Sequence, residues 1–287
     1  MHKGEDAEFY LRKGFSVVAF EADPQLVAGC RKRLKQFLDS GQLTIVEGAI
    51  VEPELIRSGQ KKVRFYRNTG NSVWGTVNAD WAKRNVELGT STNAIEVDAI
   101  NFADEIRKHG MPHFMKIDVE GCDTVCLRAL GEFEERPTYI SIESDKTSFK
   151  NIESEINLFS KLGYTSFQAV EQSMIPQSQS LRYPPREGKY VAHGFERESS
   201  GLFGSELEGK WKSRRAILRQ YRIIRLGYFF FGDRGIAHKW KFRGSSKVRS
   251  LIFRLVRLFT RAAVPGWYDT HARHRCANID KAKVPQQ

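Results

Sequence analysis

The sequence predicts an α/β fold in which an open sheet carries helices on both of its faces. Short β-rich runs such as 15–22 lack polar alternation, as expected of strands that are buried on both faces. Up to about residue 170 these runs alternate with helical patterns, which is typical of βαβ units. Two of the runs, 114–118 and 139–143, end abruptly in carboxylates.

The first half of this pattern contains clear helix boundaries and one insertion. Gly14 suits the left-handed position that ends a helix, and Asp23 with Pro24 supplies an N-cap and a first-turn proline. The expected elements are a helix over 5–12, a strand over 15–22, a helix over 24–38, a strand over 43–46, and an inserted β-hairpin with strands over 63–66 and 73–77.

The second half continues the alternation. The expected elements are a short strand over 95–97, a helix over 102–108, a strand ending at Asp118, a helix over 123–130, a strand ending at Glu143, a helix over 152–162 and a strand over 166–170. Residues 172–186 are rich in Gln, Ser and Pro, and we expect them to form a loop.

The composition is that of a globular protein without obvious membrane or secretion signals. Of the 287 residues 40% are hydrophobic, and no run of eighteen apolar residues could span a bilayer. The four cysteines form neither a Cys-x-x-Cys pair nor a disulfide framework, so we expect reduced thiols and a cytoplasmic protein. His271 and His274 lie three residues apart, but no acid or Cys completes a zinc site, and no metal site is predicted.

Charge divides the chain into an acidic body and a basic extension. Residues 210–287 hold 20 Lys and Arg against 3 Asp and Glu, whereas the other 209 residues hold 26 against 31. The two parts are therefore expected to do different jobs. We predict an α/β domain over 1–172, a loop-rich connection over 173–209 and a basic, helical extension over 210–287.

Residues 248–263 of the extension have the pattern of a basic amphipathic helix, with arginines on one face and apolar residues on the other. Such a helix can lie on an anionic membrane surface or dock on a partner, and it can equally pack against the protein's own body. Basic residues over 214–225 would also suit nucleic acid, but no RNA- or DNA-binding module is recognisable. Nucleic acid is therefore not the favoured partner, and the oligomeric state is left open.

Asp118, Glu143 and Asp145 are the candidate catalytic residues. They follow two predicted neighbouring strands, and ligands of open parallel sheets bind beyond the carboxyl ends of the strands. A carboxylate there can act as a general base on a substrate hydroxyl, or orient it, if it lies within hydrogen-bond reach. The alternative interpretation is a pair of ordinary turns with solvated acids.

A second group of residues indicates a nucleoside-containing cofactor. Glu21 ends a predicted strand 17 residues after Gly4, where an acid would accept hydrogen bonds from ribose hydroxyls. Such an acid can also simply cap the following helix. The candidate cofactor-binding residues are Gly4, Glu21, Ala22, Glu47, Gly48, Ala49 and Asp118, of which 47–49 would border an adenine.

Four short motifs carry a resemblance to a known family. They are Gly-Glu-Asp at 4–6 with Phe-Tyr at 9–10, Val-Val-Ala-Phe-Glu-Ala-Asp-Pro at 17–24, Lys-Ile-Asp-Val-Glu-Gly at 116–121 and Ile-Ser-Ile-Glu at 140–143. In their order, their spacing and the inserted hairpin they resemble the FkbM family of S-adenosylmethionine-dependent methyltransferases. The resemblance covers about residues 1–170.

The resemblance implies a Rossmann-like methyltransferase sheet and transfer of a methyl group to a hydroxyl, here of a sugar or a small metabolite. It would assign Gly4 to the turn on the methionine side of the cofactor, Glu21 to the ribose and Asp118 to the border of the methyl-transfer site. The family's first strand and its Asp-x-Gly turn have no counterpart in the sequence. We therefore expect a sheet without its first strand and Met1 to be an internal methionine of a longer protein.

Three other functions stay open at this point. A nicotinamide-dependent oxidoreductase uses a similar cleft, and an RNA methyltransferase would explain the basic extension. A catalytically inactive Rossmann-like module could instead bind a membrane surface or a partner, which would make the protein membrane-peripheral.

Overall fold

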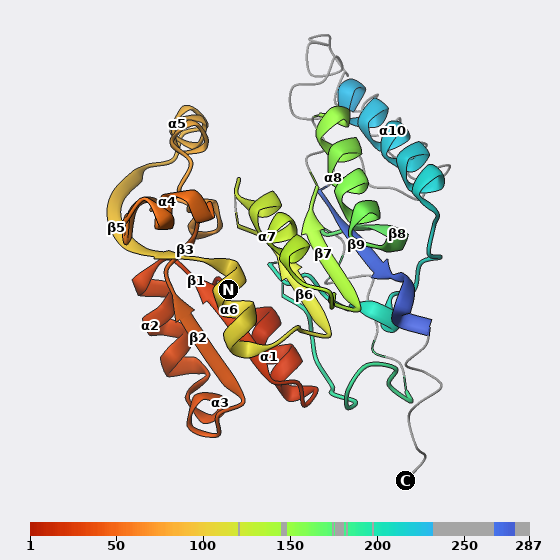
Figure 1. Ribbon diagram of the computed structural model, residues 1–287, viewed down its shortest axis with the longest axis horizontal. Coiled ribbons are helices and arrows are strands. Elements are labelled where there is room, and N and C mark those ends of the chain that lie inside the picture. The colour runs from red at the N-terminus through yellow and green to blue at the C-terminus, as the bar shows by residue number, and fades with distance from the viewer. Residues whose placement is uncertain are drawn as a thin grey trace, which may run out of the picture. The chain divides into compact units, whose positions relative to one another are not determined.

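The computed structural model divides into two compact units of mixed α/β structure (Figure 1). The first unit comprises Met1–Pro112, Ile117–Arg136 and Gln179–Glu206, and the second comprises His113–Lys116, Pro137–Ser178 and Leu207–Gln287. The structure describes residues 1–119, 121–144, 148–173, 175, 181, 183–196, 198–231 and 267–278. The predicted amphipathic helix over 248–263 lies outside the described residues.

The first unit opens with helix α1 (Glu5–Arg12) and a parallel pair of strands, β1 (Val17–Glu21) and β2 (Leu43–Glu47). The helix predicted over 24–38 is interrupted at Leu34, which gives α2 (Pro24–Arg33) and α3 (Lys35–Asp39). Leu34 is buried in a core cluster with residues of α1, β1 and β2, and its backbone leaves the helical region to reach that position. Burial therefore outweighs the continuous helical pattern of the sequence.

A second sheet of the first unit has the order β3-β5-β4. Its strands are β3 (Ala49–Ile50), β4 (Lys62–Asn68) and β5 (Thr92–Ile100), and the helices α4 (Pro53–Arg57) and α5 (Ala79–Glu87) lie between them in sequence. β5 pairs antiparallel with all seven residues of β4 and parallel with β3.

The predicted hairpin is therefore wrong in its second strand. Residues 73–77 contribute one isolated bridge, Tyr66 to Thr76, and Ser72–Trp74 is a 3₁₀ helix, η1. The side chain of Asn68 accepts hydrogen bonds from the backbone N–H groups of Gly70 and Asn71, which turns the chain out of the ladder. The long strand β5, of which only 95–97 was predicted, takes the place opposite β4.

The rest of the first unit includes helix α6 (Phe102–His109), helix α7 (Asp123–Ala129) and the 3₁₀ helix η2 (Leu130–Glu132). A segment that comprises residues 183–196 and 198–206 packs on α1, where Phe9 contacts the rings of His193 and Phe195. It ends in η3 (Gly204–Glu206), and Glu206 forms a buried ion pair with Lys13, whose Nζ lies 2.9 Å away. Pairing is required there because an unpaired buried charge is costly.

The second unit is built on a four-stranded sheet of order β6-β7-β9-β8. Its elements are β6 (Phe114–Ile117), β7 (Tyr139–Glu143), β8 (Tyr164–Glu171), β9 (Tyr268–His274), α8 (Phe149–Lys161), α10 (Arg214–Phe231) and the 3₁₀ helix η5 (Arg275–Asn278). β9 runs antiparallel to both β7 and β8 and was not predicted. Helices α8 and α10 lie side by side next to these strands (Figure 1).

The mixed α/β class is thus confirmed, whereas the expectation of a missing first strand stays a prediction. Among the described residues β1 pairs with β2 alone, and β6 pairs with β7 alone. None of the helices in the described part of the chain combines the length and the apolar character needed to cross a membrane.

A buried polar network ties β9 to the two helices of the second unit. The Ser144 hydroxyl donates to Glu155 of α8 and contacts the hydroxyl of Thr270, which in turn contacts the Tyr221 hydroxyl of α10. Burial and the charge of Glu155 raise the pKa of Tyr221, so its phenol stays neutral. Fully satisfied networks of this kind stabilise one arrangement of their elements.

Removing the Tyr221 hydroxyl should therefore destabilise the protein. We expect Tyr221→Phe to lower the free energy of unfolding by about 1–2 kcal/mol, because Thr270 loses a buried partner. Denaturant titration followed by circular dichroism measures this change. Tyr183→Phe, at a highly exposed position, is the matched control and should change stability by less than about 0.5 kcal/mol.

His271 of β9 should make the protein sensitive to acid. Burial, and second the positive charge of Lys116, lowers the pKa of His271 to about 3, while an unfolded histidine titrates near about 6.5. Between these two values the imidazole of His271 binds a proton in the unfolded chain but not in the folded chain. The stabilising contribution is complete above the unfolded pKa and is lost as the pH falls towards 3, at up to about 1.4 kcal/mol per pH unit.

The variant His271→Gln isolates this contribution. We expect the free energy of unfolding to fall less steeply between pH 6 and pH 4 in His271→Gln than in the original protein. Urea titrations at several pH values give both slopes, and identical slopes would contradict the assignment.

Candidate functional site

The carboxyl ends of β1 and β2 bring two of the predicted cofactor-binding residues together. Glu21 and Glu47 are the last residues of the two strands and are partners in the parallel register. Glu47 also pairs with Arg31 of α2 at 3.0 Å. Two neighbouring carboxylates at the carboxyl ends of parallel strands can accept hydrogen bonds from vicinal hydroxyls of a ligand.

Glu21 already accepts hydrogen bonds from nearby backbone groups. Its Oε2 accepts from the N–H of His2 at 2.7 Å and lies 3.3 Å from the amino group of Met1, and its Oε1 accepts from the N–H of Asp23 at 2.9 Å. The side chain of Glu21 is 11% exposed. Any ligand hydroxyl at Glu21 must share these oxygens or displace His2.

Gly4 and its neighbours form the turn that enters α1. Gly4 is the N-cap residue in a left-handed conformation, with φ +86°, and a Cβ there would lie 2.9 Å from the side chain of Leu34. Both conformation and space therefore favour glycine at this position.

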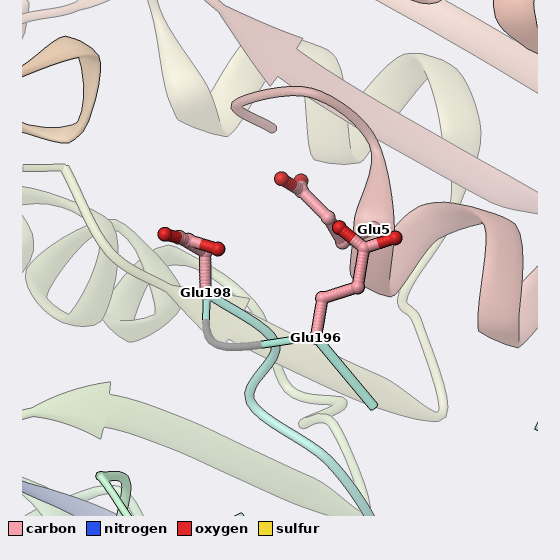
Figure 2. A group of neighbouring side chains, drawn as sticks. All are labelled: Glu5, Glu196 and Glu198. Atoms are coloured by element: carbon pink, nitrogen blue, oxygen red, sulfur yellow. The ribbon is translucent and has the colours of Figure 1, made fainter. Parts of the chain in front are cut away.

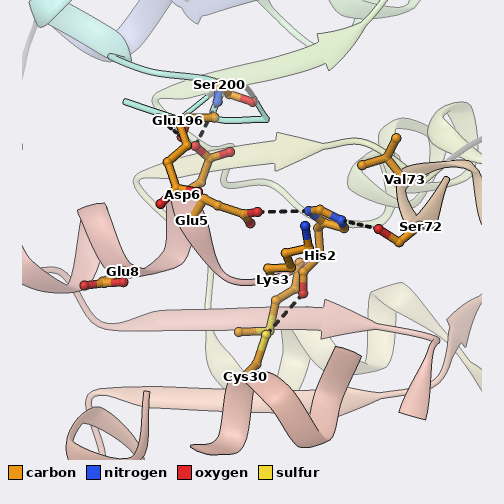
Figure 3. A network of polar contacts seen from close by, with 12 residues as sticks. His2, Lys3, Glu5, Asp6, Glu8, Cys30, Ser72, Val73, Glu196 and Ser200 are labelled. Carbon is orange, nitrogen blue, oxygen red and sulfur yellow. Dashed lines mark hydrogen bonds and ion pairs between the residues drawn. The ribbon is translucent and has the colours of Figure 1, made fainter. Parts of the chain in front are cut away.

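His2 is the centre of a polar network around this turn (Figure 3). Its ring nitrogens lie 3.1 Å from Glu5 and 2.9 Å from the hydroxyl of Ser72 in η1, and its carbonyl accepts from the thiol of Cys30. Burial is the main cause that raises the pKa of Cys30 to about 11. This thiol is therefore a packing and hydrogen-bonding group rather than a nucleophile.

Three further predicted cofactor-binding residues follow β1 and β2 directly and also contribute to packing. Gly48 has φ +145° and donates to the carbonyl of Glu21, and a Cβ would lie 2.7 Å from the carbonyl oxygen of Asp98 in β5. Ala49 is buried in β3, and Ala22 packs against the same core cluster. These positions join the two sheets of the first unit.

Asp118 is exposed and follows β6, as predicted. The loop after it is held by Asp123, whose carboxylate accepts from the N–H groups of Val119 at 2.9 Å and Gly121 at 3.4 Å. Burial, and to a smaller extent the charge of Asp118, raises the pKa of Asp123, and the two N–H donors oppose this shift. The sequence analysis missed Asp123, although an acid five residues after Asp118 at a helix start was a visible signal.

The loop passes beside helix α5. Gly121 has φ +96°, and a Cβ there would lie 3.5 Å from the ring of Trp81. The guanidinium of Arg84 stacks over that ring at 4.4 Å. The region between β4 and β5 thus contributes two neighbours of the candidate site. Trp81 lies next to the loop that follows β6, and the hydroxyl of Ser72 lies next to His2.

The other predicted catalytic residues belong to the second unit. Glu143 is the exposed last residue of β7 and is the register partner of Asp269 in β9. Asp145 lies outside the described residues.

A comparison with protein families identifies the group to which the chain belongs. A family model described as the Methyltransferase FkbM domain matches residues 1–166, which is more than half of the chain. The chain belongs to the FkbM methyltransferase family. This confirms the resemblance carried by the four sequence motifs. No curated protein and no solved structure matches the chain.

The FkbM match covers β1 to β7 and the beginning of β8, whereas α10 and β9 lie beyond it. All the residues discussed above around Glu21, Gly4 and Asp118 are therefore inside the matched range.

Three carboxylates of the first unit lie close enough to hold a cation. One oxygen each from Glu5, Glu196 and Glu198 lies within 4.8 Å of the others, and Figure 2 shows α1 and the 183–206 segment presenting them. Burial acts to raise the pKa of Glu5, but the hydrogen bond and charge of His2 outweigh it, and the pKa lies below its ordinary value. Oxygen ligands suit Mg²⁺ or Ca²⁺, but exposed acidic groups also gather without any ion.

A shallow depression of about 270 Å³ lies elsewhere, next to the segment that precedes β6. It is lined by Ile106, Arg107, Gly110, Met111, Phe133, Glu134 and Glu135. Because it lies at the amino end of β6, it is not where an open parallel sheet binds its ligand.

The packing of Gly48 on Asp98 should make this position intolerant of any side chain. We expect Gly48→Ala to lower the free energy of unfolding by about 2–4 kcal/mol, because it combines an unfavourable φ with a backbone clash. Thermal and urea unfolding measure the change. Gly29→Ala on the open face of α2, where no atom lies within 4 Å, is the matched control and should stabilise by up to about 1 kcal/mol.

Proposed function

We propose that this protein is an S-adenosylmethionine-dependent methyltransferase that methylates a hydroxyl oxygen of a sugar or a small metabolite. The observation that carries the proposal is the FkbM family match over residues 1–166. The parallel strands β1 and β2, with Glu21 beside Glu47 at their carboxyl ends, support a Rossmann-like methyltransferase sheet with its cofactor at this edge.

The residues at this edge fit an adenosine-containing cofactor in their chemistry. Glu21 is the ribose-binding residue of the proposal, because its Oε1 accepts one hydrogen bond and retains a further lone pair. Residues 47–49 would border the adenine, and Gly4 would let the backbone approach the methionine end. The bound cofactor supplies the electrophilic methyl carbon.

The protein's own part in the reaction is to position the acceptor and remove its proton. Methyl transfer is an in-line displacement, and holding the acceptor oxygen in line lowers the entropic cost of the reaction. Asp118 is the proposed general base or orienting group, and the hydrogen bonds of Asp123 to the following loop keep its backbone in place. Glu143 and Asp145 stay candidate catalytic residues on the sequence alone.

One observation favours a second candidate function, a catalytically inactive Rossmann-like module. The Oε2 of Glu21 is already engaged by the N–H of His2. A ribose hydroxyl must therefore share the oxygens of Glu21 with backbone donors or displace His2.

Asp118→Asn tests the proposed chemistry. With methyl-labelled S-adenosylmethionine and a panel of monosaccharides, nucleotide sugars, hydroxylated metabolites and total RNA, we expect label in a hydroxylated small molecule. The variant should lower kcat by about 100-fold or more and change affinity for S-adenosylhomocysteine by less than about threefold.

Asp39→Asn, an exposed acid that pairs with Lys35 on α3, is the matched control and should leave kcat unchanged. An unchanged kcat in Asp118→Asn would remove Asp118 from the reaction, and label in RNA alone would replace the proposed acceptor.

A further inference from the structure

Helix α10 of the second unit has one buried apolar face and, on its opposite side, a row of exposed apolar residues. The covered face packs against α8 and β8 through Ile217, Leu218, Tyr221 and Ile224, all of which are buried. On the opposite side Ile223, Leu226 and Phe229 are 59%, 58% and 60% exposed. Their spacing of three residues places them along one stripe of the helix surface.

This exposed stripe continues into a basic surface. The helix contains five arginines and no acidic residue, and all five arginines are exposed: Arg214, Arg215, Arg219, Arg222 and Arg225. Arg214 donates to Asn157 and Arg222 stacks over the ring of Phe149. Among the described residues no carboxylate pairs with Arg215, Arg219 or Arg225, so their charge faces outward.

The outward side of α10 thus carries cations along its first half and large apolar side chains along its second half. We propose that this face, defined by Arg215, Arg219, Arg222, Ile223, Leu226 and Phe229, docks α10 in the plane of an anionic membrane surface. A helix lying at a lipid interface buries apolar side chains at the acyl boundary while its arginines reach the phosphate level. With five arginines α10 lies on the bilayer and does not cross it.

Charge complementarity selects an anionic lipid surface as the occupant. Five cations without a single acid favour a negatively charged partner, and the three exposed apolar residues need a medium that can bury them. Nucleic acid satisfies the second requirement poorly, since of the three apolar residues Phe229 alone has a ring on which a base could stack. The buried face, with Tyr221 bonded to Thr270, keeps the helix fixed to the sheet while its other face is engaged.

The inference goes beyond the proposed methyl transfer and does not depend on it. It concerns a helix outside the FkbM match and would hold for an active or an inactive protein.

Vesicle co-sedimentation of the full chain tests the proposal. We expect binding to phosphatidylcholine vesicles that contain 30% phosphatidylserine, little binding to pure phosphatidylcholine, and weakening between 0.1 M and 0.5 M salt. Leu226→Glu with Phe229→Glu should lower the partition coefficient by about tenfold or more. Arg215→Gln with Arg219→Gln should lower it by about 25-fold, at roughly fivefold for each arginine.

Two matched control variants test whether the loss of vesicle binding is specific to this face of α10 or follows any similar change at exposed residues. Val86→Glu with Leu88→Glu introduces the same charges at exposed apolar positions of the first unit, and Arg57→Gln with Arg128→Gln removes two exposed arginines there. Both should bind vesicles nearly as well as the original protein. Circular dichroism and thermal unfolding check that every variant is folded.

Three outcomes would overturn the proposal. The first is no binding to anionic vesicles. The second is binding that the α10 variants retain at the level of their controls, which would assign it to another part of the basic extension. The third is that single-stranded RNA binds the protein and the α10 variants lose RNA binding while vesicle binding is unchanged.

Discussion

The parallel pairing of β1 with β2 is the constraint on which the rest of the first unit depends. Its register sets Glu21 beside Glu47 and places the turn of Gly4 directly next to them through the hydrogen bond from His2 to Glu21. The chain then leaves β2 through Gly48, whose backbone packs so tightly on β5 that no side chain fits. The proposed cofactor-binding edge and the connection to the second sheet are therefore fixed by the same few residues.

The second unit depends on polar contacts as much as on apolar packing. Its central strand β9 is held to the helices by the chain of hydroxyls from Ser144 through Thr270 to Tyr221. These contacts hold α10 by one face, while Ile223, Leu226 and Phe229 are exposed on the other. A helix anchored in this way can present arginines and apolar side chains outward without losing its place in the fold.

Much of this architecture could be predicted from the sequence because caps and apolar runs act locally. Helix α1, the N-cap Asp23 and the strands that end at Glu21 and Glu143 follow from such signals. Strand β9 could not be predicted in this way. Its residues Tyr-Asp-Thr-His-Ala-Arg-His are mostly polar, and the first five of them are buried only because partners distant in sequence pair with the strand.

The predicted hairpin failed for a related reason. Local turn residues around Asn68 were recognised, but the strand that pairs with β4 begins at Thr92, beyond η1 and α5. In the candidate site, patterns identified the acids at strand ends but not the group that holds the loop after β6. Asp123 has that role because its carboxylate bonds to N–H groups of Val119 and Gly121, a contact that no periodicity in the sequence reveals.

The most direct test of the central claim is calorimetric titration of the protein with S-adenosylhomocysteine. A cofactor site at the β1–β2 edge predicts micromolar binding that Glu21→Gln weakens by about tenfold or more, since a charged hydrogen-bond acceptor is lost. Absence of binding by the folded protein, or binding that Glu21→Gln leaves unchanged, would contradict the account.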